Sequence, residues 1–196
     1  NLRCEMLINP MGIDVLAPRL SWNLQSNARN TIQSAYEILV ASSKEQLAQG
    51  KADIWTSGKI ASGNSIQIPF QGKALQSNQR YFWKIRSYTN HGTTPWSETA
   101  TWSMGLLQNE DWKAQWIGWD APFAWDSVSQ FSRLSARYLR KEFKTRQAIQ
   151  KAVIHISGLG LYDLQINGQK TGDQVLATVA TDYRKTVLYN SYEVTG

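Results

Sequence analysis

Short runs in which apolar and polar residues alternate one by one restrict the fold of this 196-residue chain more than any other feature. In one run Leu20 and Trp22 share a face, and in another Tyr81, Trp83 and Ile85 do so. Successive side chains of a β-strand point to opposite sides, so this period of two is typical of strands that bury one face. The sequence therefore predicts an all-β protein.

Similar runs recur up to about Gly105, and turn-rich stretches separate them. Further residues predicted to share an inward face are Tyr36, Ile38 and Val40 in one run, and Ile66 and Ile68 in another. Several short strands at such spacing are typical of a β-sandwich. The one helix-like piece is 44–49, which follows two serines and stops at Gly50.

The aromatic content fits a sandwich and leaves a second role open. The chain has nine Trp and eight Tyr but only five Phe. Rings that carry a polar edge suit sandwich cores, and they also suit surfaces that stack against sugars.

Charge and cysteine content exclude several classes of function. The net charge is +6, but the Lys and Arg residues are spread along the chain. The densest basic stretch, 137–146, alternates with apolar residues and fits one solvated strand face better than a nucleic-acid surface. The single cysteine, Cys4, excludes an intrachain disulfide and a zinc–thiolate cluster. No apolar run reaches the 18 residues that a membrane-spanning helix needs.

The alternation breaks at 106–112, where we predict a linker between two domains. After it, strands are predicted near 115–117, 136–143, 152–157, 161–166 and 186–194. The dipeptide Asn167-Gly168 is the strongest local turn signal, because both residues tolerate positive φ and suit a two-residue hairpin.

The first half resembles the later strands of a fibronectin type III domain. Leu75, Tyr81, Trp83 and Ile85, followed by "NHGTTPWSE", carry the likeness. It implies a tyrosine corner at Tyr81. Lys84 and Arg86 would then lie opposite Trp96 in a cation–π ladder.

Over nearly its whole length the chain resembles the bacterial α-L-rhamnosidases, glycoside hydrolase family 78. The motifs that carry the likeness, in order, are "LRCEMLINPMGIDVLAPRLSW", "RYFWKIRSYTNHGTTPWSETATWSMGLL", "DWKAQWIG", "YLRKEF", "ISGLGLYDLQINGQKTGD" and "TDYRKTVLYNSYEVT". The resemblance implies a fibronectin type III-like sandwich over 1–105, the linker 106–112, and a partial jelly-roll of the galactose-binding type over 113–196.

The resemblance also implies where the chemistry lies. In the family a large α/α barrel follows the jelly-roll and carries the catalytic carboxylates, so we expect no catalytic residue in this chain. The parent enzyme would hydrolyse terminal α-L-rhamnosyl groups of glycans with inversion, in the periplasm or outside a bacterial cell. The missing C-terminal domain, or a second copy of the chain, would cover the open sheet edge.

A carbohydrate-binding role is the functional hypothesis for particular residues. The candidates are Asn167, Asp173, Asp182, Tyr183, Trp119 and Trp125. The two tryptophans are stacking candidates, and Asp173 and Asp182 are candidate calcium ligands because calcium takes carboxylate oxygens. No other cofactor is implied. For these aspartates, capping of turns is the structural alternative.

Two other functions remain open from the sequence. A standalone carbohydrate-binding module fits the aromatic content and would bind sugar without turnover. A purely structural or protein-interaction sandwich fits the first half and would bind no sugar.

Overall fold

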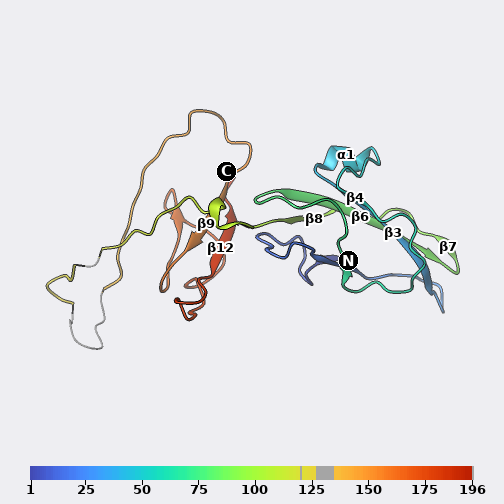
Figure 1. The fold of residues 1–196 in the computed structure, drawn as a ribbon, viewed down its shortest axis with the longest axis horizontal. Helices are drawn as coiled ribbons and strands as arrows, with labels where there is room; N and C mark the ends of the chain where they lie inside the picture. Colours follow the sequence, from blue (N-terminus) through green and yellow to red (C-terminus); the bar gives the residue numbers. More distant parts are fainter. Residues whose placement is uncertain (120, 127–134, 196) are drawn as a thin grey trace.

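The computed structural model describes residues 1–119, 121–126 and 135–195. Figure 1 shows two β-rich parts that follow one another along the long axis of the molecule. Within these residues the helical elements are α1 (Lys44–Ala48) and the 3₁₀ turn η1 (Asn109–Asp111). The predicted all-β class is confirmed. No helix among the described residues is long and apolar enough to cross a membrane.

The larger sheet of the N-terminal sandwich (residues 1–105) is antiparallel. Its strands, in spatial order, are β4 (Trp55–Thr56), β3 (Gln33–Ala41), β6 (Arg80–Thr89) and β7 (Gly92–Thr93), and β8 (Ala100–Ser103) also pairs with β6. The long central pair β3–β6 places Ile38 opposite Ile85 and Val40 opposite Trp83. This register brings the alternating apolar residues of both strands onto one face of the sheet.

A smaller sheet covers that face. It consists of β1 (Leu2–Cys4), β2 (Arg19–Trp22) and β5 (Ile68–Pro69) in the order β1–β2–β5. Leu20 and Trp22 from this sheet join Tyr36, Ile38 and Trp83 from the larger one in a single buried cluster. Two sheets that bury their apolar faces against each other form a sandwich, as the sequence predicted.

Two details of the fibronectin-like prediction are confirmed. The hydroxyl of Tyr81 accepts a hydrogen bond from the Gln76 backbone N–H at 2.8 Å, which is the tyrosine corner. Above the ring of Trp96 lie the Lys84 ammonium, 5.2 Å from the ring centroid, and the Arg86 guanidinium carbon, 4.6 Å from it. The cation–π ladder therefore runs along the outer face of the larger sheet.

One predicted alternation is wrong. Ile68 is buried, but Ile66 is 60% exposed and does not share its face. Between them, Gln67 has φ of 53°, in the left-handed region, and this twist breaks the period of two. The predicted helix is confirmed as α1, with the Ser43 hydroxyl accepting a hydrogen bond from the Gln46 N–H.

The C-terminal part (residues 113–195) has little regular structure among its described residues. β9 (Val153–Ser157) pairs antiparallel with β12 (Tyr189–Glu193), and β10 (Gln165–Ile166) pairs with β11 (Gln169–Lys170). Asn167 and Gly168 join β10 to β11 with φ values of 52° and 78°, the two positive angles that the predicted hairpin turn requires.

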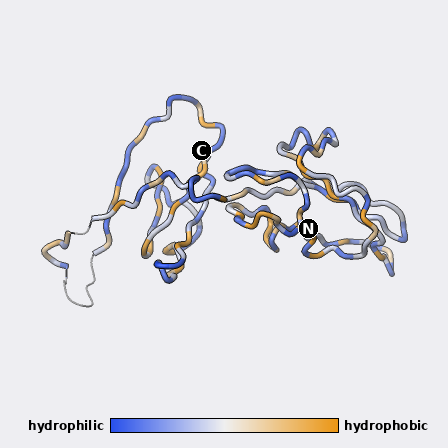
Figure 2. Tube along the Cα trace, viewed as in Figure 1, coloured by the Kyte–Doolittle hydropathy of each residue, from blue (hydrophilic) through white to orange (hydrophobic). Residues whose placement is uncertain are grey.

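Two predicted strands, 115–117 and 136–143, are absent, and the predicted strand 161–166 is reduced to β10 and a bridge between Tyr162 and Ala177. Figure 1 shows the chain before β9 as a long trace that carries no arrow. Figure 2 shows that hydrophobic residues occur along this trace, and Tyr138 and Phe143 are among its exposed side chains. A strand needs a neighbour for its backbone groups, and the described residues supply none to these segments.

The two parts meet at a junction centred on Tyr189. Its hydroxyl accepts a hydrogen bond from the Leu106 N–H at 2.8 Å. Its ring lies 5.8 Å, between centroids, from the ring of Trp112. A side chain added at Gly105 would collide with the Tyr189 hydroxyl, so the close approach requires glycine there.

Polar side chains complete the junction. Arg80 at the start of β6 forms an ion pair with Glu193 at the end of β12. His155 on β9 contacts Asn78 through Nε2 and Ser191 through Nδ1, the latter at 2.8 Å. The junction thus joins the strand ends of both parts by directional contacts.

The segment predicted as a linker is itself anchored to the sandwich. The Ser77 hydroxyl donates to the Asp111 carboxylate and accepts a hydrogen bond from the Leu107 N–H at 3.0 Å. The hydrogen bond from Ser77 is the main reason that the pKa of Asp111 lies below its ordinary value. Residues 106–112 therefore hold the two parts together through defined hydrogen bonds.

Candidate functional site

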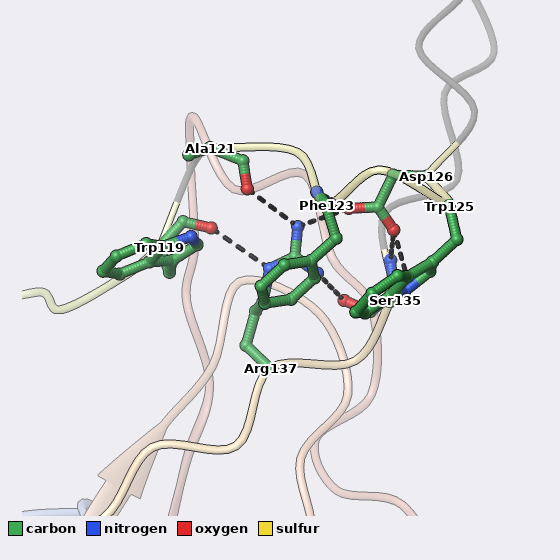
Figure 3. Close-up of polar contacts among 7 residues, drawn as sticks. All are labelled: Trp119, Ala121, Phe123, Trp125, Asp126, Ser135 and Arg137. Carbon is green, nitrogen blue, oxygen red and sulfur yellow. Dashed lines mark hydrogen bonds and ion pairs between the residues drawn. The ribbon is translucent and has the colours of Figure 1, made fainter.

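Aromatic residues gather on a loop of the C-terminal part that we call the aromatic loop, residues 119, 121–126 and 135–137 (Figure 3). A tight turn over 123–126 shapes it: the Asp126 N–H donates to the Phe123 carbonyl at 2.9 Å, and the Phe123 N–H donates to Asp126 Oδ2 at 2.7 Å. Aspartate favours such turns because its short side chain bonds nearby backbone.

The carboxylate of Asp126 is the centre of the loop. Ser135 donates to Oδ1 from its backbone N–H at 2.7 Å and also from its hydroxyl. Arg137 Nη2 lies 2.8 Å from Oδ2, and the Asp126 side chain is 0% exposed. The Ser135 hydroxyl contributes most to holding the pKa of Asp126 far below its ordinary value, with Arg137 adding to it. These contacts therefore stabilise the ionised form of the Asp126 carboxylate.

The guanidinium of Arg137 ties together backbone segments on both sides of the loop. It donates to the carbonyls of Ser135 at 2.9 Å, Ala121 at 3.2 Å and Trp119 at 3.3 Å, besides its ion pair with Asp126. Figure 3 shows these bonds converging on the one side chain. Arginine suits this task because its planar head presents five donors in a fixed fork.

The rings surround this polar centre. The Arg137 guanidinium carbon lies 4.3 Å from the Phe123 ring centroid. The ring of Phe123 in turn stacks with that of Trp125, with centroids 4.9 Å apart and planes 20° from parallel. The Trp125 indole N–H donates to the Ser135 hydroxyl at 2.9 Å, yet Trp125 is 74% exposed. The indole is thus fixed in place while most of its surface faces solvent.

Two of the predicted binding residues, Trp119 and Trp125, belong to this loop, where Arg137 contacts the backbone of one and Phe123 the ring of the other. Sequence reasoning missed Phe123, Asp126 and Arg137. The stretch "APFAWD" contains a signal for the turn, because a proline lies near an aspartate at a turn-forming spacing. Nothing local links Asp126 to an arginine 11 residues later.

Among the described residues, none of the other predicted residues forms a hydrogen bond or ion pair with the loop, and Asn167 and Asp182 take part in local turns. Asn167 occupies the β10–β11 turn. Asp182 accepts from the Arg184 side chain at 3.0 Å and from the Arg184 N–H at 3.2 Å, which is turn capping. Asp173 is exposed and Tyr183 is partly buried. In the described part of the chain, no hydrogen bond or ion pair joins these four residues to one another.

Calcium binding by Asp173 and Asp182 stays a prediction. Among the described residues there is no group of three or more His, Cys, Asp or Glu side chains that could hold a metal ion. The Asp182 carboxylate already pairs with Arg184, which contributes most to a pKa below its ordinary value.

A second polar cluster that the sequence did not indicate lies beside Asp173. The Asn190 amide donates to Gln174 Oε1 at 2.8 Å and to the Tyr162 hydroxyl at 2.9 Å, and the Tyr192 hydroxyl donates to Gln174 Oε1 at 3.0 Å. Burial raises the pKa of Tyr162 above its ordinary value. Because these side chains hydrogen-bond one another, their polar groups are satisfied within the structure, and we interpret the cluster as a structural feature beside β12.

Two family models match the chain. The model described as "Rha78A-like, N-terminal immunoglobulin domain" matches residues 1–108, and the one described as "Alpha-L-rhamnosidase N-terminal domain" matches residues 147–196. The chain belongs to the Rha78A-like α-L-rhamnosidase family. The immunoglobulin-like description agrees with the sandwich of β1 to β8, and the predicted membership in this family is confirmed.

Curated α-L-rhamnosidases are similar in sequence to almost the whole of this chain. One from Alteromonas sp. (strain LOR) is 34% identical over 194 residues, which cover 97% of this chain and 21% of that protein. One from Formosa agariphila is 32% identical over an alignment of 202 residues, which covers 95% of this chain and 21% of that protein. The chain therefore spans about one fifth of the length of these relatives.

Solved α-L-rhamnosidases share the fold. The enzyme from Dictyoglumus thermophilum matches with a TM-score of 0.87 and 36% identity, over 100% of this chain and 23% of its own. The Streptomyces avermitilis enzyme, solved with L-rhamnose, matches with a TM-score of 0.59 and 25% identity, over 98% of this chain and 20% of its own. The chain thus corresponds to an N-terminal region of these rhamnosidases.

Proposed function

We propose that the chain is the N-terminal accessory region of an inverting α-L-rhamnosidase, and that it supports a catalytic part supplied by a longer polypeptide. The observation that carries this proposal is the match of the whole chain to 23% of a solved α-L-rhamnosidase at a TM-score of 0.87. The parent enzyme would hydrolyse terminal α-L-rhamnosyl groups of glycans in the periplasm or outside the cell.

The state of the carboxylates supports an accessory role. Inverting glycosidases use two carboxyl groups about 6.5–9.5 Å apart across the sugar, one as acid and one as base. In the C-terminal part, Asp126 and Asp182 each form an ion pair with an arginine, and the pKa of each lies below its ordinary value. A carboxylate held by an arginine is a poor general acid, because the cation lowers its pKa. These carboxylates therefore maintain structure.

The junction supports a scaffolding task. Tyr189, Arg80 and His155 make directional contacts between the two parts, and 106–112 is hydrogen-bonded to the sandwich. A module that positions a neighbouring domain needs such fixed geometry. We propose the division 1–105, 106–112 and 113–196 as sandwich, anchored linker and partial jelly-roll.

The same proposal accounts for the exposed apolar residues of 136–143. This segment is a predicted strand, and its Tyr138, Leu139 and Phe143 are exposed. Further strands of the jelly-roll in a longer polypeptide would pair with it and cover these side chains. A second copy of the chain is the alternative source of such strands, and chain-concentration dependence of the molecular mass distinguishes the two.

A chimera tests the accessory role. In the Dictyoglumus thermophilum enzyme, this chain replaces the region that it matches, which is 23% of that enzyme. We expect the chimera to fold and to hydrolyse an aryl α-L-rhamnoside, and the enzyme without this region to be unstable. The chain alone is expected to release no phenol above the uncatalysed rate.

Two outcomes would contradict the proposal. Hydrolysis by the chain alone would place catalytic groups within it. A chimera that melts at the temperature of the native enzyme but lacks activity would show that the chain does not support the catalytic part.

A further inference from the structure

We propose that the aromatic loop is a sugar-binding platform, on which Trp125, backed by Phe123, stacks against a pyranose ring of a rhamnose-containing glycan. The proposal rests on the proposed function for the class of ligand. It goes beyond that function by assigning a binding surface to named residues of this chain.

The first argument is the fixed position of an exposed ring. A tryptophan that is 74% exposed normally samples several rotamers, but Trp125 is held by its stack on Phe123 and by the bond from its indole N–H to Ser135. An exposed ring that is already ordered loses little conformational entropy when a ligand binds to it. Trp125 therefore has the property that a binding platform needs.

The second argument is the buried ion pair beneath the rings. Ordering a loop costs conformational entropy, and burying the Asp126 carboxylate costs solvation. The loop compensates with Arg137, which bonds three carbonyls and Asp126. This internal network holds the rings of Phe123 and Trp125 on the outside of the loop. Closing the loop does not by itself require that arrangement, because the rings could instead turn inward.

The third argument is the chemistry that the platform leaves available. The indole N–H is used by Ser135, and Arg137 donates to Trp119, Ala121, Ser135 and Asp126. The loop therefore offers ring faces, which carry partial negative charge. The C–H groups on one side of a pyranose, and the methyl group of a 6-deoxy sugar such as rhamnose, carry the complementary partial positive charge.

The test is affinity electrophoresis of the full 196-residue chain through gels that contain a soluble rhamnan. We expect retardation of the chain, and we expect Trp125→Ala to weaken it by roughly 2- to 10-fold, the range for one lost ring contact. Trp125→Phe should keep most of the binding, because a ring face remains.

Matched controls separate stacking from general exposure. Tyr138 is 86% exposed, and among the described residues its side chain forms no hydrogen bond, ring stack or cation–π contact with the aromatic loop, so Tyr138→Ala should leave the retardation unchanged. Asp126→Asn should weaken binding together with an increased rate of proteolysis in the loop. The urea midpoint of the N-terminal sandwich should be the same in every variant.

Three outcomes would overturn the platform. The first is no retardation of the chain by rhamnan. The second is equal effects of Trp125→Ala and Tyr138→Ala. The third is an unchanged retardation in Trp125→Ala, accompanied by a lower melting temperature of the chimera with this substitution, which would mean that the ring packs against the rest of the polypeptide. If the chimera is active while one of these outcomes is observed, the proposed function stands and only the sugar-binding platform is contradicted.

Discussion

The N-terminal sandwich and the C-terminal part share the same alternating sequence pattern but bury very different amounts of it. In the sandwich, residues such as Leu20, Ile38, Trp83 and Trp102 are 0% exposed. Of the described residues after 105, only Ala177 and Thr178 are buried. Alternation therefore indicates which face a strand is suited to bury, whereas a second sheet determines whether that face is buried.

The sheets themselves give the physical reason. β3 and β6 each have neighbours on both sides, and the sheet β1–β2–β5 covers their apolar face. In the described chain β9 has the single neighbour β12, and two-stranded pairs are at best marginally stable alone. The C-terminal part therefore depends on its junction with the sandwich, and on strands from elsewhere, more than on a core of its own.

The largest loss of stability is expected from a substitution in the closed core of the N-terminal sandwich. Trp83→Ala should lower the free energy of unfolding of the N-terminal sandwich by about 3–5 kcal/mol, the cost of emptying a large buried site. The indole N–H of Trp83 has no hydrogen-bond partner in the described part of the chain, so the loss measures packing. Urea denaturation followed by near-ultraviolet circular dichroism gives the value.

The matched control for this prediction is Trp125→Ala in the open part. Because Trp125 is largely exposed, its removal should change the same free energy by less than about 0.5 kcal/mol. Similar losses at the two tryptophans would mean that the two parts unfold as one unit and do not differ in stability.

A smaller effect is expected at the junction that joins the two regions. Gly105→Ala forces a methyl group against the Tyr189 hydroxyl, and overpacking of this kind costs about 1–3 kcal/mol. Tyr189→Phe removes the bond from Leu106 and should cost about 0.5–1.5 kcal/mol. The measurement is urea unfolding of the C-terminal part, together with the rate of proteolysis within 106–112.

The double variant makes the test specific. Removing the hydroxyl relieves the collision, so Gly105→Ala combined with Tyr189→Phe should cost less than the sum of the single variants. Effects that add to within about 0.5 kcal/mol would show that the two groups are not coupled. In that case the junction would depend on its ion pair and rings instead.

Local signals in the sequence predicted the features that neighbouring residues determine. The β3–β6 face, the corner at Tyr81 and the turn at Asn167-Gly168 follow from spacing within a few residues, and the structure contains each of them. Gln67 shows the limit of this local reasoning. The pattern predicts that Ile66 and Ile68 share a buried face, but the left-handed backbone at Gln67 leaves Ile66 exposed while Ile68 is buried.

Long-range pairings could not be predicted in the same way. The stretch 136–143 mixes apolar and charged residues and is a predicted strand, but pairing requires a partner strand that its own sequence does not identify. The pair Asp126–Arg137 joins residues across a loop whose path is not encoded in their spacing. Likewise, the loop positions of Asp173 and Asp182 suggest a shared calcium site from sequence, whereas in the structure Asp182 caps its own turn.

The smallest expected effect is a pH dependence that distinguishes the junction from the rest of the molecule. Burial lowers the pKa of His155 below its ordinary value of 6.5. Between the lowered and the ordinary pKa, the unfolded chain binds more protons at this site than the folded one. The stability that neutral His155 contributes is therefore fully present above pH 6.5 and is lost as the pH falls towards the lowered pKa.

We accordingly expect the free energy of unfolding of the C-terminal part to decrease on acidification from pH 7 to pH 5, because a charged ring at β9 must shed its solvation beside Asn78, Tyr189 and Ser191. Urea titrations at half-unit intervals measure the slope. His155→Gln, which keeps a polar group but cannot gain the charge, should flatten it, and His91→Gln, at the exposed turn between β6 and β7, should not. An unchanged slope in His155→Gln would contradict the assignment of this pH dependence to His155.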